Sequence, residues 1–197
     1  MDRGKHILIV VENLPVPFDR RVWLESTTLT RAGYEISVIC PQSNTYSEPY
    51  EEIEGVRIHR YPPPPPTTTK ISYAWEFPYC WMMTLKLAFR IHRKRPIDAM
   101  HACNPPDTFF LIGRILRALG GARFVYDQHD LCPELYLSRF GGRPAVLFGI
   151  LRALELATYR AADMIIATNE SYREHAIDVG EVTRERTFVV RSGPRVS

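Results

Sequence analysis

The stretch Phe124-Val125-Tyr126-Asp127-Gln128-His129-Asp130-Leu131-Cys132-Pro133-Glu134 joins a short apolar run to a cluster of titratable side chains that contains a proline. A short apolar run of this kind predicts a buried strand. In an open parallel sheet, ligands bind outside the carboxyl ends of the strands, so we expect a cleft there lined by Asp127, His129, Asp130 and Glu134. His129 is the candidate acid, base or hydrogen-bonding residue because an unperturbed histidine titrates near neutral pH. The alternative is that Asp130 caps the next turn and His129 is a hydrogen-bonded loop histidine.

Strands and helices alternate on both sides of this stretch. Apolar runs predict strands at His6–Val11, Ile36–Cys40, Val56–Arg60, Ile97–His101, Met164–Ala167 and Thr187–Val190. Helical spacings and end signals predict helices from Asp19 to Gly33, Ser72 to Arg95, Pro106 to Gly120, Ala145 to Ala161 and Asn169 to Val179. This alternation predicts an α/β fold with a doubly wound, mainly parallel, Rossmann-like sheet that carries helices on both faces. His101 and Asn104, at the end of one strand and in the loop after it, are therefore candidate substrate-binding residues.

The loop after the first strand, Glu12 to Asp19, lies at the same expected edge of the sheet and contains two prolines. No glycine occurs between Gly4 and Gly33, so the G-x-G-x-x-G motif of an NAD or FAD site is absent. Asp19 is placed to cap the following helix. Arg21, in the first turn of that helix, is a candidate for contact with an anionic substrate, and the alternative is a solvated arginine.

The composition is that of an ordinary soluble domain. The chain has 197 residues, 45% of them hydrophobic and 24% charged, with a net charge of +3. That length predicts one domain, and the small charge without a basic arm or zinc-finger spacing argues against nucleic acid as a partner. The four cysteines form no C-x-x-C pair, which argues against a zinc knuckle and favours a reducing, cytoplasmic compartment.

Two further segments have unusual composition. The uninterrupted proline run Pro62 to Pro66 predicts a stiff, exposed connector. The stretch Tyr73 to Met83 is rich in aromatic residues, which suits either contact with lipid or packing into the core, and we favour packing. No apolar run approaches the 18 or so residues of a membrane helix, so any membrane contact would be peripheral.

The order of these pieces resembles the N-terminal domain of GT-B glycosyltransferases of the family 4 type, particularly those that build bacterial surface polysaccharides. Four stretches carry the resemblance: HILIVVENLPVPFDRRVWLESTTLTRAGYEISVICP, FVYDQHDLCPELY, ADMIIATNESYREHAI and FVVRSGP. The resemblance implies retaining transfer of a sugar from a nucleotide-activated donor, with no metal or other cofactor. It implies that His129 hydrogen-bonds the donor sugar and braces positive charge in the transition state, and that Pro17, Phe18 and Asp19 approach the donor phosphates or the acceptor.

The resemblance covers half of such an enzyme. Residues 1–191 correspond to the acceptor-side domain, and residues 192–197 to the start of a linker toward a C-terminal donor-binding domain or partner subunit. The Gly-Gly pair that many relatives carry in the first loop is missing, and no two glutamates lie eight positions apart, so the E-x7-E signature is also missing. We therefore expect this chain alone to be catalytically incomplete.

Three hypotheses follow. The first is half of a glycosyltransferase acting on a saccharide or lipid-linked acceptor, as part of a longer chain or as one subunit of a split enzyme. The second is a binding module that holds such an acceptor without catalysis. The third is a metal-dependent hydrolase that uses Asp127, His129 and His101, although these residues lack an ordered ligand spacing.

Overall fold

The computed structural model describes residues 4–64, 70–141, 145–191 and 193, the side chains of 70–75, 139 and 140 excepted. Within these residues an eight-stranded sheet has the order β3-β4-β2-β1-β5-β6-β7-β8. Every neighbouring pair is parallel except β3 with β4. The strands are β1 His6–Val10, β2 Glu35–Pro41, β3 Tyr50–Ile53, β4 Val56–Tyr61, β5 Ala99–Cys103, β6 Arg123–Gln128, β7 Met164–Ala167 and β8 Thr187–Val189.

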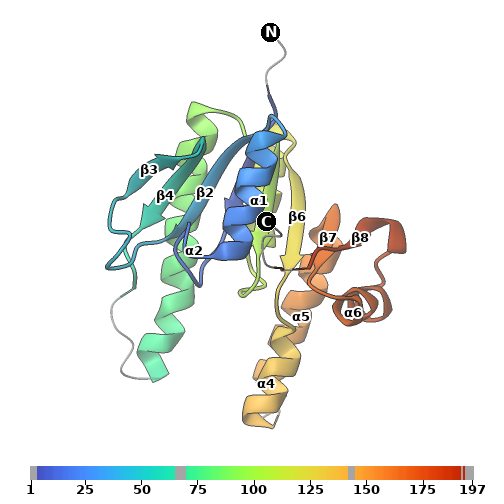
Figure 1. Cartoon of the computed structure of the whole chain (residues 1–197). Helices are drawn as coiled ribbons and strands as arrows, with labels where there is room; N and C mark the ends of the chain where they lie inside the picture. The colour runs from blue at the N-terminus through green and yellow to red at the C-terminus, as the bar shows by residue number, and fades with distance from the viewer. Residues whose placement is uncertain (1–3, 65–69, 142–144, 192, 194–197) are drawn as a thin grey trace.

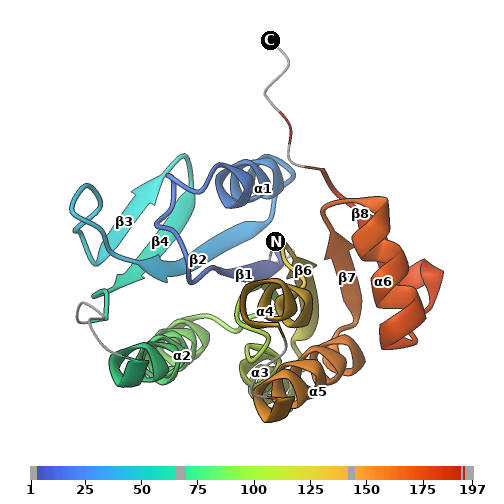
Figure 2. The same ribbon diagram turned by 90° about the horizontal axis from the view of Figure 1, so that it is seen from below.

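The helices lie on both faces of this sheet. They are α1 Arg20–Arg31, α2 Lys70–Lys94, α3 Phe110–Gly120, α4 Cys132–Phe140, α5 Ala145–Ala161 and α6 Glu170–Gly180, with a short 3-10 helix at Arg184–Arg186. Helix α1 covers one face, and α2, α3 and α5 cover the opposite face (Figure 2). Helix α4 projects beyond the end of the sheet together with the start of α5 (Figure 1). The predicted doubly wound α/β fold is therefore confirmed.

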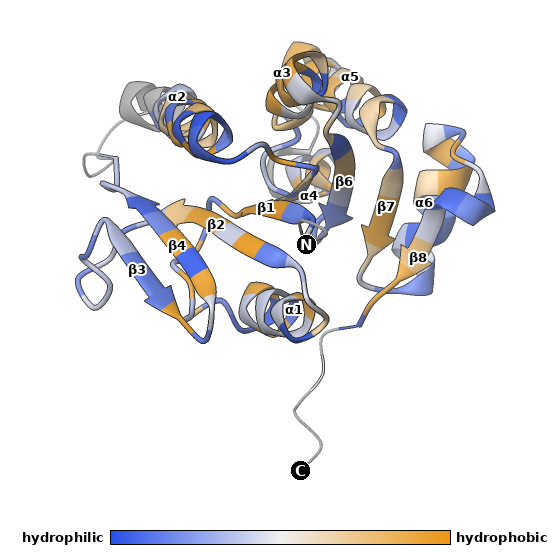
Figure 3. Ribbon diagram, turned by 90° about the horizontal axis from the view of Figure 1, so that it is seen from above, coloured by the Kyte–Doolittle hydropathy of each residue, from blue (hydrophilic) through white to orange (hydrophobic). Residues whose placement is uncertain are grey.

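A separate core fills the space on each side of the sheet. On the α2 face the core includes Leu8, Met100 and Phe124, all at most 1% exposed. On the α1 face it includes Ile9, Val22 and Val38, which are fully buried. The strands β1 and β7 are largely apolar, whereas β6 ends in hydrophilic residues (Figure 3). That difference follows from the sequence, because β6 runs directly into Asp127 and Gln128.

The ends of α1 follow the sequence signals closely. The carboxylate of Asp19 accepts a hydrogen bond from the main-chain N of Val22 at 3.1 Å, which is the expected N-cap. Gly33 follows the helix with φ +90°, in the left-handed region that glycine adopts without a steric penalty. These caps fix where α1 starts, and therefore fix the position of Arg21 in its first turn.

Two elements differ from the sequence prediction. The polar character of residues 42–54 predicts a loop, but Tyr50–Ile53 forms the edge strand β3 in a hairpin with β4. This strand is polar because it lies at the sheet edge, with Tyr50 half exposed. Helix α4 is not predicted, because Pro133 is interpreted there as the end of the preceding segment. In the structure Pro133 lies in the first turn of α4, where the N–H that proline lacks would have no partner within the helix. The strand predicted at Ile97–His101 is shifted to Ala99–Cys103.

Several predicted features lie partly outside the described residues. These are the later part of the proline run, Trp75 and its neighbours, and residue 192 with 194–197. In the described part of α2, Cys80 is buried and the Trp81 indole N–H donates to the carbonyl of Thr108 at 3.4 Å, as packing predicts. Met82 is 57% exposed on the outer side. Within the described residues, no helix combines the length and apolar character needed to cross a membrane.

Candidate functional site

Asp127 lies at the centre of the candidate site. It is the fifth residue of β6, near the carboxyl end of that strand, and it is fully buried. In the sheet register it pairs with Cys103 on β5 and Ile166 on β7. A buried carboxylate is stable only where other groups supply hydrogen bonds or positive charge, and four side chains contact it here.

Arg21 supplies the strongest of these contacts. Its guanidinium Nη2 donates to Asp127 Oδ1 at 2.7 Å and its Nε to Asp127 Oδ2 at 3.1 Å, which makes a bidentate pair across 106 residues of sequence. The third nitrogen, Nη1, donates to the carbonyl of Val190 at 2.7 Å. The side chain is 9% exposed. Arg21 therefore joins the start of α1, the end of β6 and the segment that leaves β8.

His129 follows Asp127 by two residues and lies against the same carboxylate. Its Nε2 is 2.7 Å from Asp127 Oδ2 and 3.0 Å from Arg21 Nε. We assign the hydrogen of this contact to Nε2, because two unprotonated acceptors would repel each other at 2.7 Å. The Arg21 Nε N–H points at both His129 Nε2 and Asp127 Oδ2, and under this assignment it donates to the carboxylate. In the neutral imidazole, Nδ1 is then the acceptor. The imidazole is 22% exposed, so it can meet a substrate.

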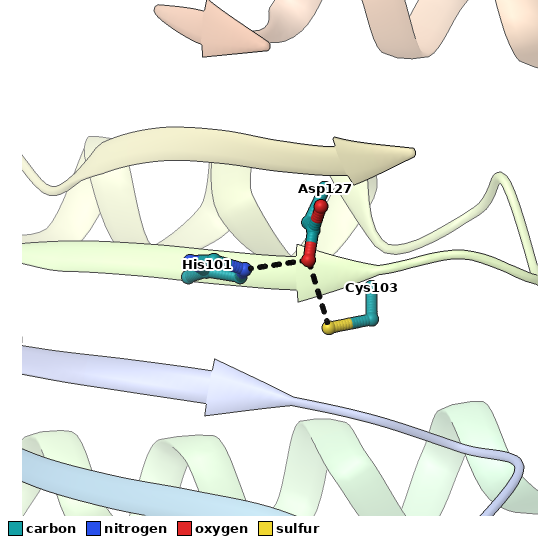
Figure 4. A group of neighbouring side chains, drawn as sticks. All are labelled: His101, Cys103 and Asp127. Carbon is teal, nitrogen blue, oxygen red and sulfur yellow. Dashed lines mark hydrogen bonds and ion pairs between the residues drawn. The ribbon is translucent and has the colours of Figure 1, made fainter. Parts of the chain in front are cut away.

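His101, Glu25 and Cys103 complete the network. His101 Nε2 lies 3.3 Å from Asp127 Oδ2, and the Cys103 thiol donates weakly to the same oxygen at 3.8 Å (Figure 4). Glu25 lies one turn after Arg21 on α1, with a carboxylate oxygen 3.2 Å from Arg21 Nε and another 3.6 Å from His101 Nε2. Two carboxylates, two histidines and an arginine are thus gathered on the α1 face of the sheet.

The electrostatics follow from this crowding. Burial by itself raises the pKa of Asp127, but hydrogen bonds from His101, His129 and Arg21 outweigh burial and hold that pKa well below its usual range. Burial lowers the pKa of His101, yet Asp127 and Glu25 raise it overall. Burial raises the pKa of Glu25, and neighbouring Asp127 adds to the rise. At neutral pH Asp127 is therefore ionised, while Glu25 is the member of the network whose ionised form is disfavoured.

Asn104 holds the loop that carries His129. Its side-chain oxygen accepts from the main-chain N of His129 at 2.6 Å and of Asp130 at 3.1 Å. Its amide N donates to the carbonyl of Asp130 at 2.7 Å and to Asp107 Oδ1 at 3.1 Å. Asn104 is 2% exposed, and its side chain is used to hold the backbone of the loop at His129 and Asp130. The residue before α4 is Leu131, whose side chain makes no capping bond.

Glu134 lies in a second cluster rather than with Asp127. Its carboxylate is within 4.8 Å of ligand atoms of Glu155 and His175, where α4, α5 and α6 meet. Phe18, in the first loop, is 62% exposed and so available for contact, whereas the carboxylate of Asp19 is used to cap α1. The neighbouring Pro17 is half-buried.

Two clusters of potential metal ligands each have an arginine bound to one of their carboxylates. In the group His101, Cys103 and Asp127, Arg21 already takes both carboxylate oxygens, and burial keeps the pKa of the Cys103 thiol well above its usual value. A protonated thiol is a poor metal ligand. In the other group, Arg152 Nη1 lies 2.5 Å from the Glu155 carboxylate, where it would repel a cation. The geometry therefore gives no support to the metal-dependent hydrolase hypothesis.

A cavity of about 830 Å³ adjoins the network on the α1 face of the sheet. Its polar lining includes Arg21, Glu25 and His101 from the network, together with Arg20, Thr28 and Arg191. Most of the remaining lining is apolar and comes from α1, the central strands and the segment after β8, including Ile7, Leu24, Val125, Met164, Ile166 and Val190. Met164 and Val190 are 39% and 41% exposed. This is an apolar sheet surface that the described helices leave open.

Sequence reasoning found His129, Asp127 and His101 as members of one site, and it found Arg21 without its partner. It missed Glu25, Cys103 and the carbonyl of Val190. Glu25 could have been found, since it lies four residues after Arg21 and therefore on the same side of the helix. Arg21 and Val190 are 169 residues apart, so no local sequence pattern predicts their contact.

Comparisons with known proteins identify the family and the fold of the chain. Residues 19–193 match the model of the glycosyl transferase 4-like domain. No curated protein matches the sequence. Among solved structures, sucrose-phosphate synthase from Thermosynechococcus elongatus superposes with a TM-score of 0.73 at 14% identity, over 96% of this chain and 48% of that protein.

Two further structures show the same fold. The catalytic domain of starch synthase IV from Arabidopsis thaliana, bound to ADP and acarbose, has a TM-score of 0.65 at 10% identity over 97% of this chain and 52% of its own. Anabaena HepE, in complex with UDP-glucose, has a TM-score of 0.56 at 13% identity over 95% of this chain and 44% of its own. The chain thus spans about half the length of these structures and shares their fold. It belongs to the glycosyl transferase 4-like family.

Proposed function

We propose that this chain is the acceptor-side half of a retaining glycosyltransferase. The complete enzyme would move a sugar from a nucleotide-sugar donor to a saccharide or lipid-linked acceptor in the synthesis of cell-surface polysaccharide. One observation carries the proposal: in a domain of this family, an accessible histidine, His129, is held against a buried carboxylate at the carboxyl end of β6. This is the edge of a parallel sheet where ligands bind.

The role proposed for His129 is hydrogen bonding to the donor sugar. With hydrogen on Nε2, its Nδ1 can accept from a sugar hydroxyl, and the negative charge of Asp127 behind the ring favours positive charge near it. Glycosyl transfer develops oxocarbenium character in the transition state. The exposed Phe18 and the loop around it would approach the donor phosphates or the acceptor.

We propose that the reaction needs no metal ion or other cofactor. The support is that Arg21 already binds both carboxylate oxygens of Asp127, so a metal ion at this carboxylate would have to displace the guanidinium. The charge of the leaving nucleoside diphosphate would then be met by basic residues outside this chain.

The experiment offers the complete enzyme a panel of UDP-, GDP- and ADP-sugars and measures transfer as the release of nucleoside diphosphate. We expect one donor to react, with unchanged rate in EDTA and with the anomeric configuration of the donor kept in the product by NMR. Inverted configuration would contradict the retaining proposal, and loss of rate in EDTA would contradict metal independence. Hydrolysis without any nucleotide-sugar requirement would favour the hydrolase hypothesis instead.

The partner in this proposal is a donor-binding domain or subunit. The open apolar cavity beside Val190 supports it, because exposed apolar surface of this kind commonly marks an interaction site. The intact mass of the native polypeptide separates the alternatives: about twice 22.7 kDa indicates one long chain. A mass equal to this chain, with a co-purifying subunit that restores transfer, indicates a split enzyme. Such a mass with no transfer activity in the cell extract favours a non-catalytic acceptor-binding module.

We also propose that the enzyme works peripherally at the cytoplasmic face of a membrane. The support is the outer side of α2, where exposed apolar Met82 and Phe89 alternate with exposed Lys86 and Arg90. Basic and apolar side chains on one helix face suit an anionic lipid surface. Flotation with phosphatidylglycerol-containing liposomes should fall strongly in the Lys86→Glu, Arg90→Glu double variant. Equal flotation of both proteins would contradict this surface.

A further inference from the structure

The strand-end network contains more fixed geometry than one hydrogen-bonding histidine needs. Asp127 Oδ2 receives contacts from Arg21 Nε, His129 Nε2 and His101 Nε2, at 3.1, 2.7 and 3.3 Å. Its other oxygen, Oδ1, is bound by Arg21 Nη2 at 2.7 Å. Because the carboxylate is fully buried and bound on both oxygens, it cannot rotate freely. It is a rigid acceptor placed beside the imidazole.

Arg21 makes that acceptor rigid for a geometric reason. A guanidinium presents its N–H groups in a planar fork that matches both oxygens of a carboxylate, whereas lysine offers a single flexible donor. The guanidinium is itself anchored by Nη1 on the carbonyl of Val190. Through Arg21, the orientation of Asp127 thus depends on three segments of the chain. These are the start of α1, the end of β6 and the segment after β8.

The histidine is held from two directions. Its main-chain N–H is bound by Asn104 at 2.6 Å, and its ring Nε2 by Asp127 at 2.7 Å. The backbone contact fixes where the ring starts, and the ring contact fixes which nitrogen carries the hydrogen. A loop histidine with no role beyond packing would not require both.

We propose that Asp127 and Arg21 are positioning residues, which hold His129 as the Nε2–H tautomer so that Nδ1 accepts a hydrogen bond from a hydroxyl of the donor sugar. This inference rests on the proposed function. It assigns to Arg21 a task inside the protein, through Asp127, instead of direct contact with an anion. It also gives a reason for the contact of Arg21 with Asp127 Oδ1, because His129 and His101 contact only Oδ2.

The test is a double-mutant cycle in the complete enzyme, with Asp127→Asn, His129→Ala and both together. An amide at position 127 can donate to the imidazole and so favours the wrong tautomer. We expect Asp127→Asn to lower kcat about 100-fold with KM changed less than threefold, and Arg21→Lys about 10-fold. In the His129→Ala background, Asp127→Asn should change kcat by less than about twofold, because residues that act through one group are not additive.

A matched control is Asp163→Asn, which removes another carboxylate that accepts from two arginines, Arg117 and Arg123, at the opposite end of β6. Its kcat should stay within about twofold of wild type. If the fold-losses of kcat in Asp127→Asn and His129→Ala multiplied in the double variant, the two residues would act independently. That result would overturn the inference and leave the proposed function intact. Wild-type activity of His129→Ala would instead overturn the proposed role of His129.

The tautomer gives a readout that does not depend on activity. In enzyme labelled with 15N-histidine, with the His129 signals assigned by comparison with His129→Ala, the wild type should show the hydrogen on Nε2. Arg21→Lys, the more conservative change, should broaden or shift those signals. If His129 carries its hydrogen on Nδ1 in the folded wild-type enzyme, the inference is wrong, whether or not Asp127→Asn folds.

Discussion

His129 and His175 each lie beside a buried carboxylate, yet the two pairs have different surroundings. His129 Nε2 is 2.7 Å from Asp127 at the end of a strand, and the carboxylate is fixed by the fork of Arg21. His175 Nε2 is 3.1 Å from Glu155 in the middle of α5, where it joins α6 to α5. Similar groups therefore serve different purposes according to the element that carries them.

The second pair belongs to a network that connects helices. Glu155 is 1% exposed, receives Arg152 at 2.5 Å and lies 3.4 Å from the hydroxyl of Tyr159. Tyr159 in turn accepts from Gln128 at 2.6 Å. The contacts of Glu155 with His175 and of Tyr159 with Gln128 hold α5 to α6 and to β6, whereas Arg152 and Tyr159 bind Glu155 within α5. We expect their loss to affect the free energy of unfolding rather than the chemistry.

The largest effect that separates the two pairs is expected for Glu155→Gln. Loss of this buried charge removes the ion pairs with Arg152 and His175, and should lower the free energy of unfolding by about 1–3 kcal/mol. Urea denaturation of the purified chain measures it. Glu174→Gln, which removes only the partner of the exposed Arg184, should change stability by less than about 0.5 kcal/mol. If the two variants were equally stable, the helix-connecting role of Glu155 would be wrong.

An intermediate effect concerns pH. The hydrogen bond to Glu155 raises the pKa of His175 above its usual 6.5, despite some opposing burial. A raised folded-state pKa contributes stability that is fully present below the unfolded pKa and is lost as pH rises through the folded pKa. The stability difference between wild type and His175→Gln should therefore be larger at about pH 5.5 than at about pH 8.5. A difference that grows with pH would contradict the assignment.

Asp127 should behave in the opposite way. Its lowered pKa contributes stability that is present above the usual aspartate pKa and is lost only as pH falls through the folded value. Across the window in which His175 loses its proton, the Asp127 contribution should stay constant. The pH dependence thus separates the contribution of Asp127 from that of His175 without any substitution at Asp127.

The smallest expected effect is a gain. Burial, with a contribution from Asp127, raises the pKa of Glu25, so its ionised form is disfavoured in the folded chain at neutral pH. Glu25→Gln should raise the free energy of unfolding at about pH 7 by about 1 kcal/mol, and the gain should vanish toward acid pH as Glu25 becomes protonated in both states. Thermal or urea unfolding checks this, and destabilisation at neutral pH would show that Glu25 is needed as a counter-charge.

The sequence predicts the parts of the site that depend on local order. The apolar run before Asp127 predicts a buried strand, and strand ends in a parallel sheet share one edge, so the sequence alone groups Asp127, His129 and His101. Asp19 is recognisable as a cap for a similar reason, since its bond reaches only three residues along the chain. Local rules suffice where the interacting groups are close in sequence or lie at equivalent strand ends.

The remainder depends on contacts that no local rule reaches. Arg21 meets Asp127 over 106 residues and Val190 over 169, so its partners follow only from the packing of α1 on the sheet. Glu134 is predicted beside Asp127, but the turn into α4 directs it to Glu155 and His175. The edge strand β3 is missed because an exposed edge needs no apolar run.

The most direct measurement is kcat of the complete enzyme carrying His129→Ala, compared with the same enzyme carrying His175→Ala. We predict a loss of at least about 100-fold for His129→Ala and less than about threefold for His175→Ala, with both proteins folded by circular dichroism. Equal losses, or near wild-type activity of His129→Ala, would contradict the claim that the strand-end histidine is the one that takes part in sugar transfer.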